Sequence, residues 1–346
     1  MRSIFNGEST NNKAEQIRKE EEVKTIATTK IEEVENTNNP RRWRSIKHAI
    51  MKRHVLLNLV LAFGFLAVTV LVPVGQTAQA HGKKSKELVV PTVFQAAGPT
   101  AESIQGTVDA FRAALGNPNN GNAGPQQTGH REINWDGGDP TLMTTTAPVT
   151  PFNVFLNTRG GQFTTPGMGL SQAPPSGGPQ GGGLEALFNN PTYGTTFSAF
   201  SPSRLFTPVG SNITEALFFV PGANPNLQPG TNPEDPATVR GFGAVFTDVD
   251  EPNGIGPLKR RGNPRGASTL MEYFDDHGKL IFSSFVPASP GDGGFSFFGI
   301  VFDDDDAQRI ARVRITTGDV APGPDDDEKR DIVMMDDFIY GEPQPQ

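Results

Sequence analysis

The chain has 346 residues, of which 35% are hydrophobic and 20% are charged, and it contains no cysteine. Its 39 glycines and 30 prolines make up about a fifth of all residues. This composition excludes a long coiled coil, a multi-span membrane protein, a disulfide-stabilised scaffold and any site built on cysteine. The 24 phenylalanines still supply enough apolar area for a folded core.

Charge is divided unevenly along the chain. Residues 1–80 carry 12 Lys and Arg against 8 Asp and Glu, whereas residues 81–346 carry 18 against 30. An acidic surface has the wrong sign for phosphate backbones, so we expect no nucleic-acid partner. The same surface is compatible with divalent cations, with neutral polymers, or simply with solubility.

Residues 1–50 are polar and rich in charge, and two interpretations fit them. They form a disordered leader, because so little apolar surface cannot support a core. Alternatively, Met51 is the true start and the first fifty residues are a misassigned extension. Neither interpretation puts function in this segment.

Residues 51–80 have the pattern of a secretory signal peptide. A basic segment at 52–54 precedes an apolar run over 55–74, and an Ala-x-Ala pattern ends at Ala80. We expect cleavage after Ala80 and secretion of residues 81–346, with membrane contact only through this segment before cleavage. The alternative is an uncleaved anchor, since the apolar run is nearly long enough to span a bilayer.

The start of the exported part predicts a tether, one helix and a linker. Residues 81–98 are expected to be the tether, and residues 99–116 an amphipathic helix. The apolar residues on one helical face are Ile104, Val108, Phe111 and Leu115. Residues 117–129 are rich in Asn, Gly and Pro, which is typical of a linker.

Residues 130–341 predict one β-domain, followed by a tail at 342–346. Short apolar runs between Gly- and Pro-rich loops are typical of an antiparallel β-sandwich. The predicted strands cover residues 131–135, 152–156, 215–220, 239–246, 269–274, 279–286, 295–302, 310–316 and 332–340. We therefore expect an all-β fold with one short N-terminal amphipathic helix.

Five segments carry a resemblance to a known family. They are GFGAVFTD (241–248), YFDDHGKLIF (273–282), FSFFGIVFD (295–303), IARVRI (310–315) and DDFIYG (336–341). Their order resembles the jelly-roll, galactose-binding-like sandwich domains of bacterial exported proteins, often associated with PEP-CTERM sorting tails. The resemblance implies a jelly-roll-type β-sandwich that associates with a polysaccharide or another cell-surface polymer. The apolar helix of such a tail does not follow, so we expect release rather than anchoring.

The resemblance also implies a structural calcium ion between the first strand and a carboxylate of the last. On this chain it points to Asp336 or Asp337, with further ligands near Glu132 and Asp136. Because side chains alternate along a strand, we expect the two last-strand Asp residues to face opposite ways, with one pointing inward. The alternative is that these Asp side chains cap the backbone where the strand begins.

A second calcium candidate comes from the residues alone. Asp248 and Asp250 alternate in an acidic turn, DVDEPNG, and hard oxygen ligands of this kind are what calcium takes. The spacing departs from an EF-hand loop, and a polar turn is the alternative.

Aromatic residues supply the candidate ligand surface. The rings of Trp135, Tyr273 and Tyr340 can stack on a sugar if they are exposed, and the alternative is that they lie in the core. No catalytic motif selects a nucleophile or a metal-binding His pair, so we name no catalytic residue. The expected function is a non-catalytic exported protein that binds carbohydrate or a cell-surface polymer with structural calcium. A secreted polysaccharide hydrolase and a structural matrix protein are the alternatives.

Overall fold

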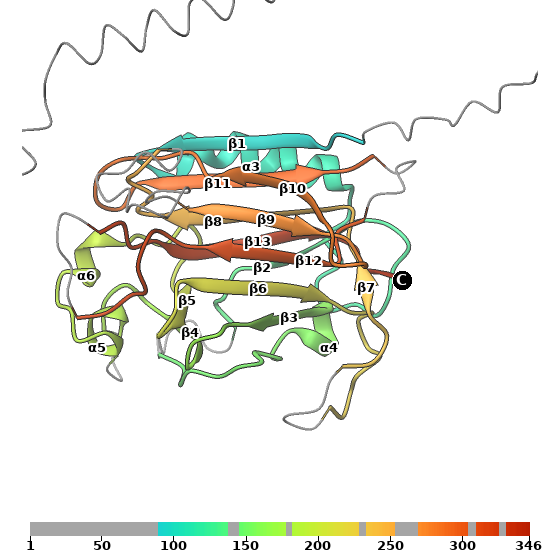
Figure 1. Ribbon diagram of the computed structural model, residues 1–346, viewed down its shortest axis with the longest axis horizontal. Coiled ribbons are helices and arrows are strands. Elements are labelled where there is room, and N and C mark those ends of the chain that lie inside the picture. Colours follow the sequence, from blue (N-terminus) through green and yellow to red (C-terminus); the bar gives the residue numbers. More distant parts are fainter. Residues whose placement is uncertain are drawn as a thin grey trace, which may run out of the picture. The chain divides into compact units, whose positions relative to one another are not determined.

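The computed structural model describes residues 89–137, 145–177, 182–227, 233–252, 269–303, 309–324 and 330–346. The leader, the signal segment and the beginning of the tether lie outside these residues. Within the described part, most elements are strands of antiparallel sheets, which confirms the all-β expectation (Figure 1). No helix among the described residues is long and apolar enough to cross a membrane.

The larger sheet has seven strands in the order β1-β11-β8-β13-β5-β4, with β2 paired to β13 as well. Its strands are β1 (Thr92–Gly98), β2 (His130–Ile133), β4 (Gly169–Ala173), β5 (Leu205–Val209), β8 (Gly241–Thr247), β11 (Phe295–Val301) and β13 (Met334–Gly341). Two strands pair with the same edge of β13: β5 pairs at Met335, and β2 pairs from Phe338 onward. The middle of β13 therefore lies where β5 and β2 meet.

The smaller sheet has five strands in the order β10-β9-β12-β6-β3. Its strands are β3 (Gly161–Thr164), β6 (Ile213–Phe218), β9 (Leu270–Phe274), β10 (Leu280–Phe285) and β12 (Arg312–Thr316). The predicted hairpin between β9 and β10 is confirmed. The remaining elements are the pair β7 (Ala237–Thr238) and β14 (Gln344–Pro345), and the short helices α4 (Leu156–Arg159), α5 (Leu184–Leu187) and α6 (Tyr193–Thr196).

The main core contains side chains from both sheets, so the sheets face each other across it. Aromatic rings dominate this core, and several of them pack against the ring of Trp135. Its ring stacks on Phe206 with a centroid distance of 3.6 Å and meets the Phe338 ring edge-on at 4.9 Å. Large buried rings supply much of the free energy that stabilises such a core.

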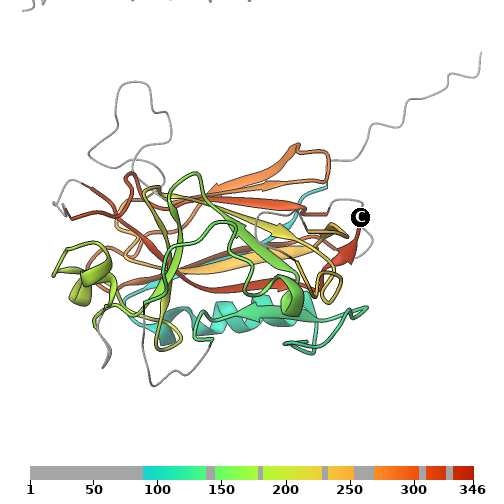
Figure 2. The ribbon, with the colours of Figure 1, turned by 90° about the horizontal axis from the view of Figure 1, so that it is seen from below.

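Helix α3 (Ala101–Leu115) covers the outer face of the larger sheet (Figure 2). Its predicted apolar face is buried, and the ring of Phe111 lies over two glycines that are register partners, Gly243 on β8 and Gly299 on β11. A Cβ added at these positions would lie 2.9 and 2.7 Å from atoms of that ring. The glycines of the GFG and FFG segments therefore form a hollow for Phe111.

Two predicted segments at the ends of the domain are wrong. The tether was expected to run to residue 98, but Thr92–Gly98 forms β1 at the edge of the larger sheet, because Phe94 and Ala96 pack under α3. The expected tail at 342–346 is also ordered, because Glu342 is buried and Gln344–Pro345 forms β14.

The predicted strand at 152–156 is also wrong. Phe152 makes an isolated bridge to Phe163, and Leu156 already begins α4. Phe152, Phe155 and Leu156 are all buried. A straight strand would point neighbouring residues to opposite faces, so the chain turns in order to bury all three.

Candidate functional site

β13 contains a β-bulge at Asp336 and Asp337. Met335 pairs with Phe246 and Phe338 pairs with Ala244, so three steps along β13 match two along β8. Met335 and Phe338 both belong to the main core. Because a bulge re-aims the residues that it contains, both Asp carboxylates reach one serine hydroxyl. The expectation that they face opposite ways is wrong.

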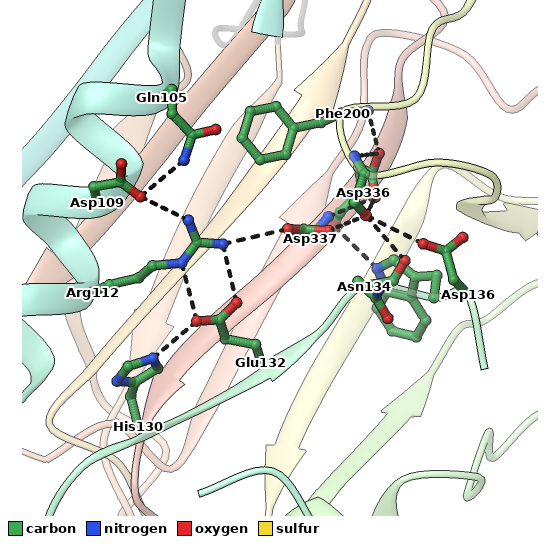
Figure 3. Close-up of polar contacts among 12 residues, drawn as sticks. Gln105, Asp109, Arg112, His130, Glu132, Asn134, Asp136, Phe200, Asp336 and Asp337 are labelled. Atoms are coloured by element: carbon green, nitrogen blue, oxygen red, sulfur yellow. Dashed lines mark hydrogen bonds and ion pairs between the residues drawn. The ribbon is translucent and has the colours of Figure 1, made fainter. Parts of the chain in front are cut away.

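Five oxygen atoms converge beside this bulge, and we call them the oxygen cluster (Figure 3). They are Asn134 O, Asp136 Oδ2, Ser201 Oγ, Asp336 Oδ1 and Asp337 Oδ1. Ser201 Oγ lies 2.6 Å from the Asp337 oxygen and 3.3, 3.4 and 3.5 Å from those of Asp336, Asn134 and Asp136. A hydroxyl has one proton, and the shortest contact takes it. Asp336 Oδ1 also accepts a 2.9 Å bond from Asp337 N, which leaves the contacts of Ser201 Oγ with Asn134 O and Asp136 Oδ2 without a proton between them.

Trp135 explains how Asn134 and Asp136 both reach the cluster. Its φ of +63° lies in the left-handed region, which is uncommon for a bulky residue and reverses the chain locally. The indole ring enters the core, and its Nε1 donates a 3.0 Å hydrogen bond to the main-chain oxygen of Asp336. Trp135 therefore anchors the bulge from the core side.

The three aromatic residues predicted to contact a ligand are fully buried. Trp135, Tyr273 and Tyr340 each have an exposed fraction of 0%. The hydroxyls of Tyr273 and Tyr340 donate to the main-chain oxygens of Phe242 and Arg159, at 3.3 and 3.0 Å. Rings held in the core offer no face to a sugar, so this prediction is wrong.

The loop of residues 200–204 fixes one oxygen of two cluster carboxylates with main-chain N–H groups. Asp336 Oδ2 accepts a 2.6 Å bond from Phe200 N, and Asp136 Oδ1 accepts a 2.8 Å bond from Arg204 N. The second oxygen of each carboxylate points to Ser201. The loop thus orients both groups toward the cluster.

Burial makes charge costly in the cluster. It raises the pKa of Asp336 well above its ordinary value, and the charge of Asp337 raises it further. Burial also raises the pKa of Asp337 and that of Asp136. Carboxylates in such surroundings bind a proton, or a cation, more readily than they would in water.

An ion-pair network lies next to the oxygen cluster (Figure 3). Arg112 on α3 donates two 3.0 Å bonds to the two oxygens of Glu132 and one 3.0 Å bond to Asp109. Its Nη2 also lies 3.6 Å from Asp337 Oδ2. Arg112 and His130 engage the carboxylate of Glu132, which takes no part in the oxygen cluster, and Glu132 as a calcium ligand stays a prediction.

Both ring nitrogens of His130 face oxygen acceptors, as in a doubly protonated imidazole. Its Nδ1 lies 2.6 Å from Gly116 O and its Nε2 lies 2.9 Å from Glu132 Oε1, and both partners accept. Burial alone would lower the pKa of His130, but these two bonds outweigh it and the pKa is raised. Sequence reasoning missed this pair, although His-x-Glu on a strand places both side chains on one face.

Asp248 and Asp250 do not join the oxygen cluster. Asp250 Oδ1 accepts a 2.9 Å bond from Gly291 N, and Asp250 N donates to Asp331 Oδ1 at 3.4 Å. Burial, with the charges of Asp250 and Asp319 nearby, raises the pKa of Asp331 to about 8. Within the described residues, Asp331 Oδ2 has no hydrogen-bond partner. Calcium at Asp248 and Asp250 stays a prediction.

A third acidic group lies in the turn between β9 and β10. In the described part of the chain, Asp275, Asp276 and His277 form the group whose ligand atoms lie within 4.8 Å of one another. Asp275 Oδ1 accepts bonds of 3.0 and 2.8 Å from the main chain of His277 and Lys279. The hydrogen bonds of an exposed turn account for this group.

The oxygen cluster offers carboxylate, main-chain carbonyl and hydroxyl oxygens, which are the hard ligand types that calcium takes at about 2.3–2.6 Å. Within the described residues, however, the carboxylates of Asp136, Asp336 and Asp337 do not form a group whose ligand atoms all lie within 4.8 Å of one another. Calcium at this cluster stays a prediction. Comparison of the chain with family models, curated proteins and solved structures gives no match.

Proposed function

We propose that this chain is an exported, non-catalytic jelly-roll-type β-sandwich that binds a polysaccharide or another cell-surface polymer and holds one calcium ion. The observation that carries the proposal is the oxygen cluster. It joins three separate segments: the chain after β2, the loop before β5 and the bulge of β13. One divalent cation there would tie the segments together and offset the charges of Asp136, Asp336 and Asp337.

The architecture supports a binding domain. Two antiparallel sheets face each other across an aromatic core, and α3 closes the outer face of the larger sheet. The oxygen cluster lies at the junction of β2, β5 and β13, where Asp336 and Asp337 are buried. A cation at this position would stabilise the fold without taking up a surface for a polymer.

The positions of the acidic residues favour binding over hydrolysis. A glycosidase needs two carboxyl groups that contact the scissile bond. Asp336 is 0% exposed and Asp337 is 4% exposed, so a polysaccharide cannot reach them. Their raised pKa values therefore fit a structural cation better than an acid–base pair.

Calcium binding is tested by titrating Ca²⁺ into chelator-treated protein by calorimetry. We expect one saturable site and a higher melting temperature in the wild type, and neither in Asp336→Asn. Asp276→Asn in the exposed β9–β10 turn is the matched control and should bind as the wild type does. Equal binding by the wild type and Asp336→Asn would reject the oxygen cluster as the site.

Polymer binding is tested by retention on insoluble polysaccharides and cell-wall preparations, with calcium and with chelator. Selective retention supports the proposal, and retention lost in chelator links it to the ion. No retention in either buffer would reject the binding role. The export part is tested by the mass of the extracellular protein, which should begin at His81.

A further inference from the structure

A polar pocket opens between the end of α3 and the C-terminal segment, with a volume of about 220 Å³. Its lining comes from segments that lie far apart in the sequence: Leu115, Gly116, Gln127, Thr128, Gly129, Arg240, Arg309, Glu342 and Gln344. It shares no residue with the oxygen cluster. Pockets for drug-sized ligands have about 300–1,000 Å³, so this one has room for a single sugar unit.

The carboxylate in this pocket is already satisfied. Glu342 accepts bonds of 2.7 Å from both Nε and Nη2 of Arg131, which is fully buried, and bonds of 2.8 and 3.0 Å from Asn120 Nδ2 and Gln126 N. Four hydrogen bonds fill the acceptor capacity of a carboxylate. Glu342 therefore offers a ligand neither a free acceptor nor an uncompensated negative charge.

The pocket also contains two arginines, and one of them is unengaged. Arg240 is fixed by a 3.2 Å bond from its Nε to Phe302 O. Arg309 has no hydrogen-bond or ion-pair partner in the part of the chain that the structure describes. A guanidinium presents paired donors that match a carboxylate in a bidentate geometry. Among the described residues, Arg309 therefore brings an unpaired positive charge to the pocket, although the chain carries a net charge of −8.

The neutral lining suits hydroxyl groups. Gln127, Thr128 and Gln344 contribute amides and a hydroxyl, which can both donate and accept. Screening limits the reach of the acidic surface to about 8 Å at physiological salt. A negatively charged ligand of this size can therefore be held locally by Arg309.

We propose that this pocket binds one uronic acid unit, a sugar that carries a carboxylate, from an acidic polysaccharide. The proposal rests on the proposed function, because it names the polymer class that the exported domain recognises. Arg309 binds the carboxylate, and the polar lining contacts the ring hydroxyls.

The test is titration of the full chain with free glucuronate and galacturonate by calorimetry. Monosaccharides avoid the cross-linking of acidic polymers by calcium. Glucose controls for the ring and acetate for the carboxylate. We expect one uronate to bind at least tenfold more tightly than either control. Arg309→Gln should weaken it at least tenfold at unchanged melting temperature, and Lys279→Gln should bind as the wild type does.

The outcomes separate the two proposals. The pocket proposal is overturned if Arg309→Gln binds uronate as tightly as the wild type does, or if the wild type binds glucose as tightly as uronate. If a neutral polysaccharide is retained equally by the wild type and by Arg309→Gln, the pocket proposal is also overturned. The proposed function is then unaffected. Uronate binding without retention of any polymer supports the pocket and overturns the proposed function.

Discussion

Glu342 and Asp336 are both buried carboxylates of the C-terminal segment, but their surroundings differ. Glu342 accepts two bonds from a buried arginine and two from amide donors. Asp336 accepts main-chain N–H bonds on both oxygens, and its Oδ1 also lies in the cluster with the carboxylates of Asp136 and Asp337. Glu342 is therefore paired directly with a buried arginine, whereas among the described residues the three cluster carboxylates have only the longer 3.6 Å ion-pair contact between Arg112 and Asp337.

The difference predicts how each region responds to solution conditions. Arg131 supplies a permanent counter-charge to Glu342, so this pair should be insensitive to chelators. The oxygen cluster should be sensitive to chelators and to acidity, because its carboxyl groups have raised pKa values. Arg131→Ala and Asp336→Asn test this contrast directly, and two smaller effects, at Asp331 and His130, extend it to other buried charged groups.

Arg131→Ala should have the largest effect on stability. It leaves Glu342 buried without its counter-charge and frees four main-chain oxygens that Arg131 now engages, those of Gly121, Ala123, Gly124 and Thr158. We expect the free energy of unfolding to fall by about 3–5 kcal/mol, equally with calcium and with chelator, in urea denaturation. Arg314→Ala, in a more exposed pair, should cost less than about 1 kcal/mol. Similar losses for the two variants would contradict this interpretation.

Asp336→Asn should change stability by an amount that depends on calcium. With calcium at a hundred times its dissociation constant, the wild type gains about 2.7 kcal/mol, and the variant should lose that gain. In chelator the loss should be smaller: the Asn amide accepts main-chain N–H bonds on one atom only, but the repulsion from Asp337 is gone. Urea denaturation in both buffers measures this. A loss of equal size in the two buffers would mean that no ion is involved.

Asp331→Asn should stabilise the protein at high pH. The folded-state pKa is about 8 against an ordinary 3.8, so the folded state binds the proton more tightly and stability falls as the pH rises between these values. The variant lacks this loss and should be at least about 1 kcal/mol more stable than the wild type at pH 8, with no difference near pH 4. Denaturation in chelator across this range measures it. A variant less stable at pH 8 would contradict the sign.

His130→Gln should have the smallest effect, about 1 kcal/mol. The pKa of His130 is raised above its ordinary 6.5. Its contribution to stability is therefore complete below pH 6.5 and is lost as the pH rises through the folded-state value. The difference between variant and wild type should shrink from pH 6 to pH 9. His277→Gln in the exposed turn is the control and should show no such trend.

Sequence patterns predicted the strands whose apolar residues alternate or run together, such as β8, β9, β11 and β12. They missed β4, because its buried Ser171 and Gln172 look like loop residues. Ser171 Oγ donates to Thr146 O at 2.5 Å, and Gln172 Nε2 donates to Trp135 O at 2.6 Å. Because these hydrogen-bond partners lie far away in the sequence, the segment has no local pattern that would indicate a buried strand. The burial of Ser171 and Gln172 is explained only by the folded structure.

The candidate site was predicted in part. The carboxylates of Asp136, Asp336 and Asp337 all approach Ser201 Oγ, and the calcium ion that the resemblance implies between them stays a prediction. Ser201 was missed, because nothing in its own segment distinguishes it. The bulge was missed as well, although Met335 and Phe338 leave a trace of it. Two buried residues three apart in a strand require an extra residue between them.

The hollow that Gly243 and Gly299 form beneath Phe111 ties three positions of the chain together. A methyl group at either glycine would take space that the ring occupies, and a smaller residue at position 111 would leave that space empty. Either change alone should destabilise the packing, so we expect relatives of this chain to change the three positions together. The helix and the two strands should therefore be inherited as one unit, even where the loops between them differ in length and composition.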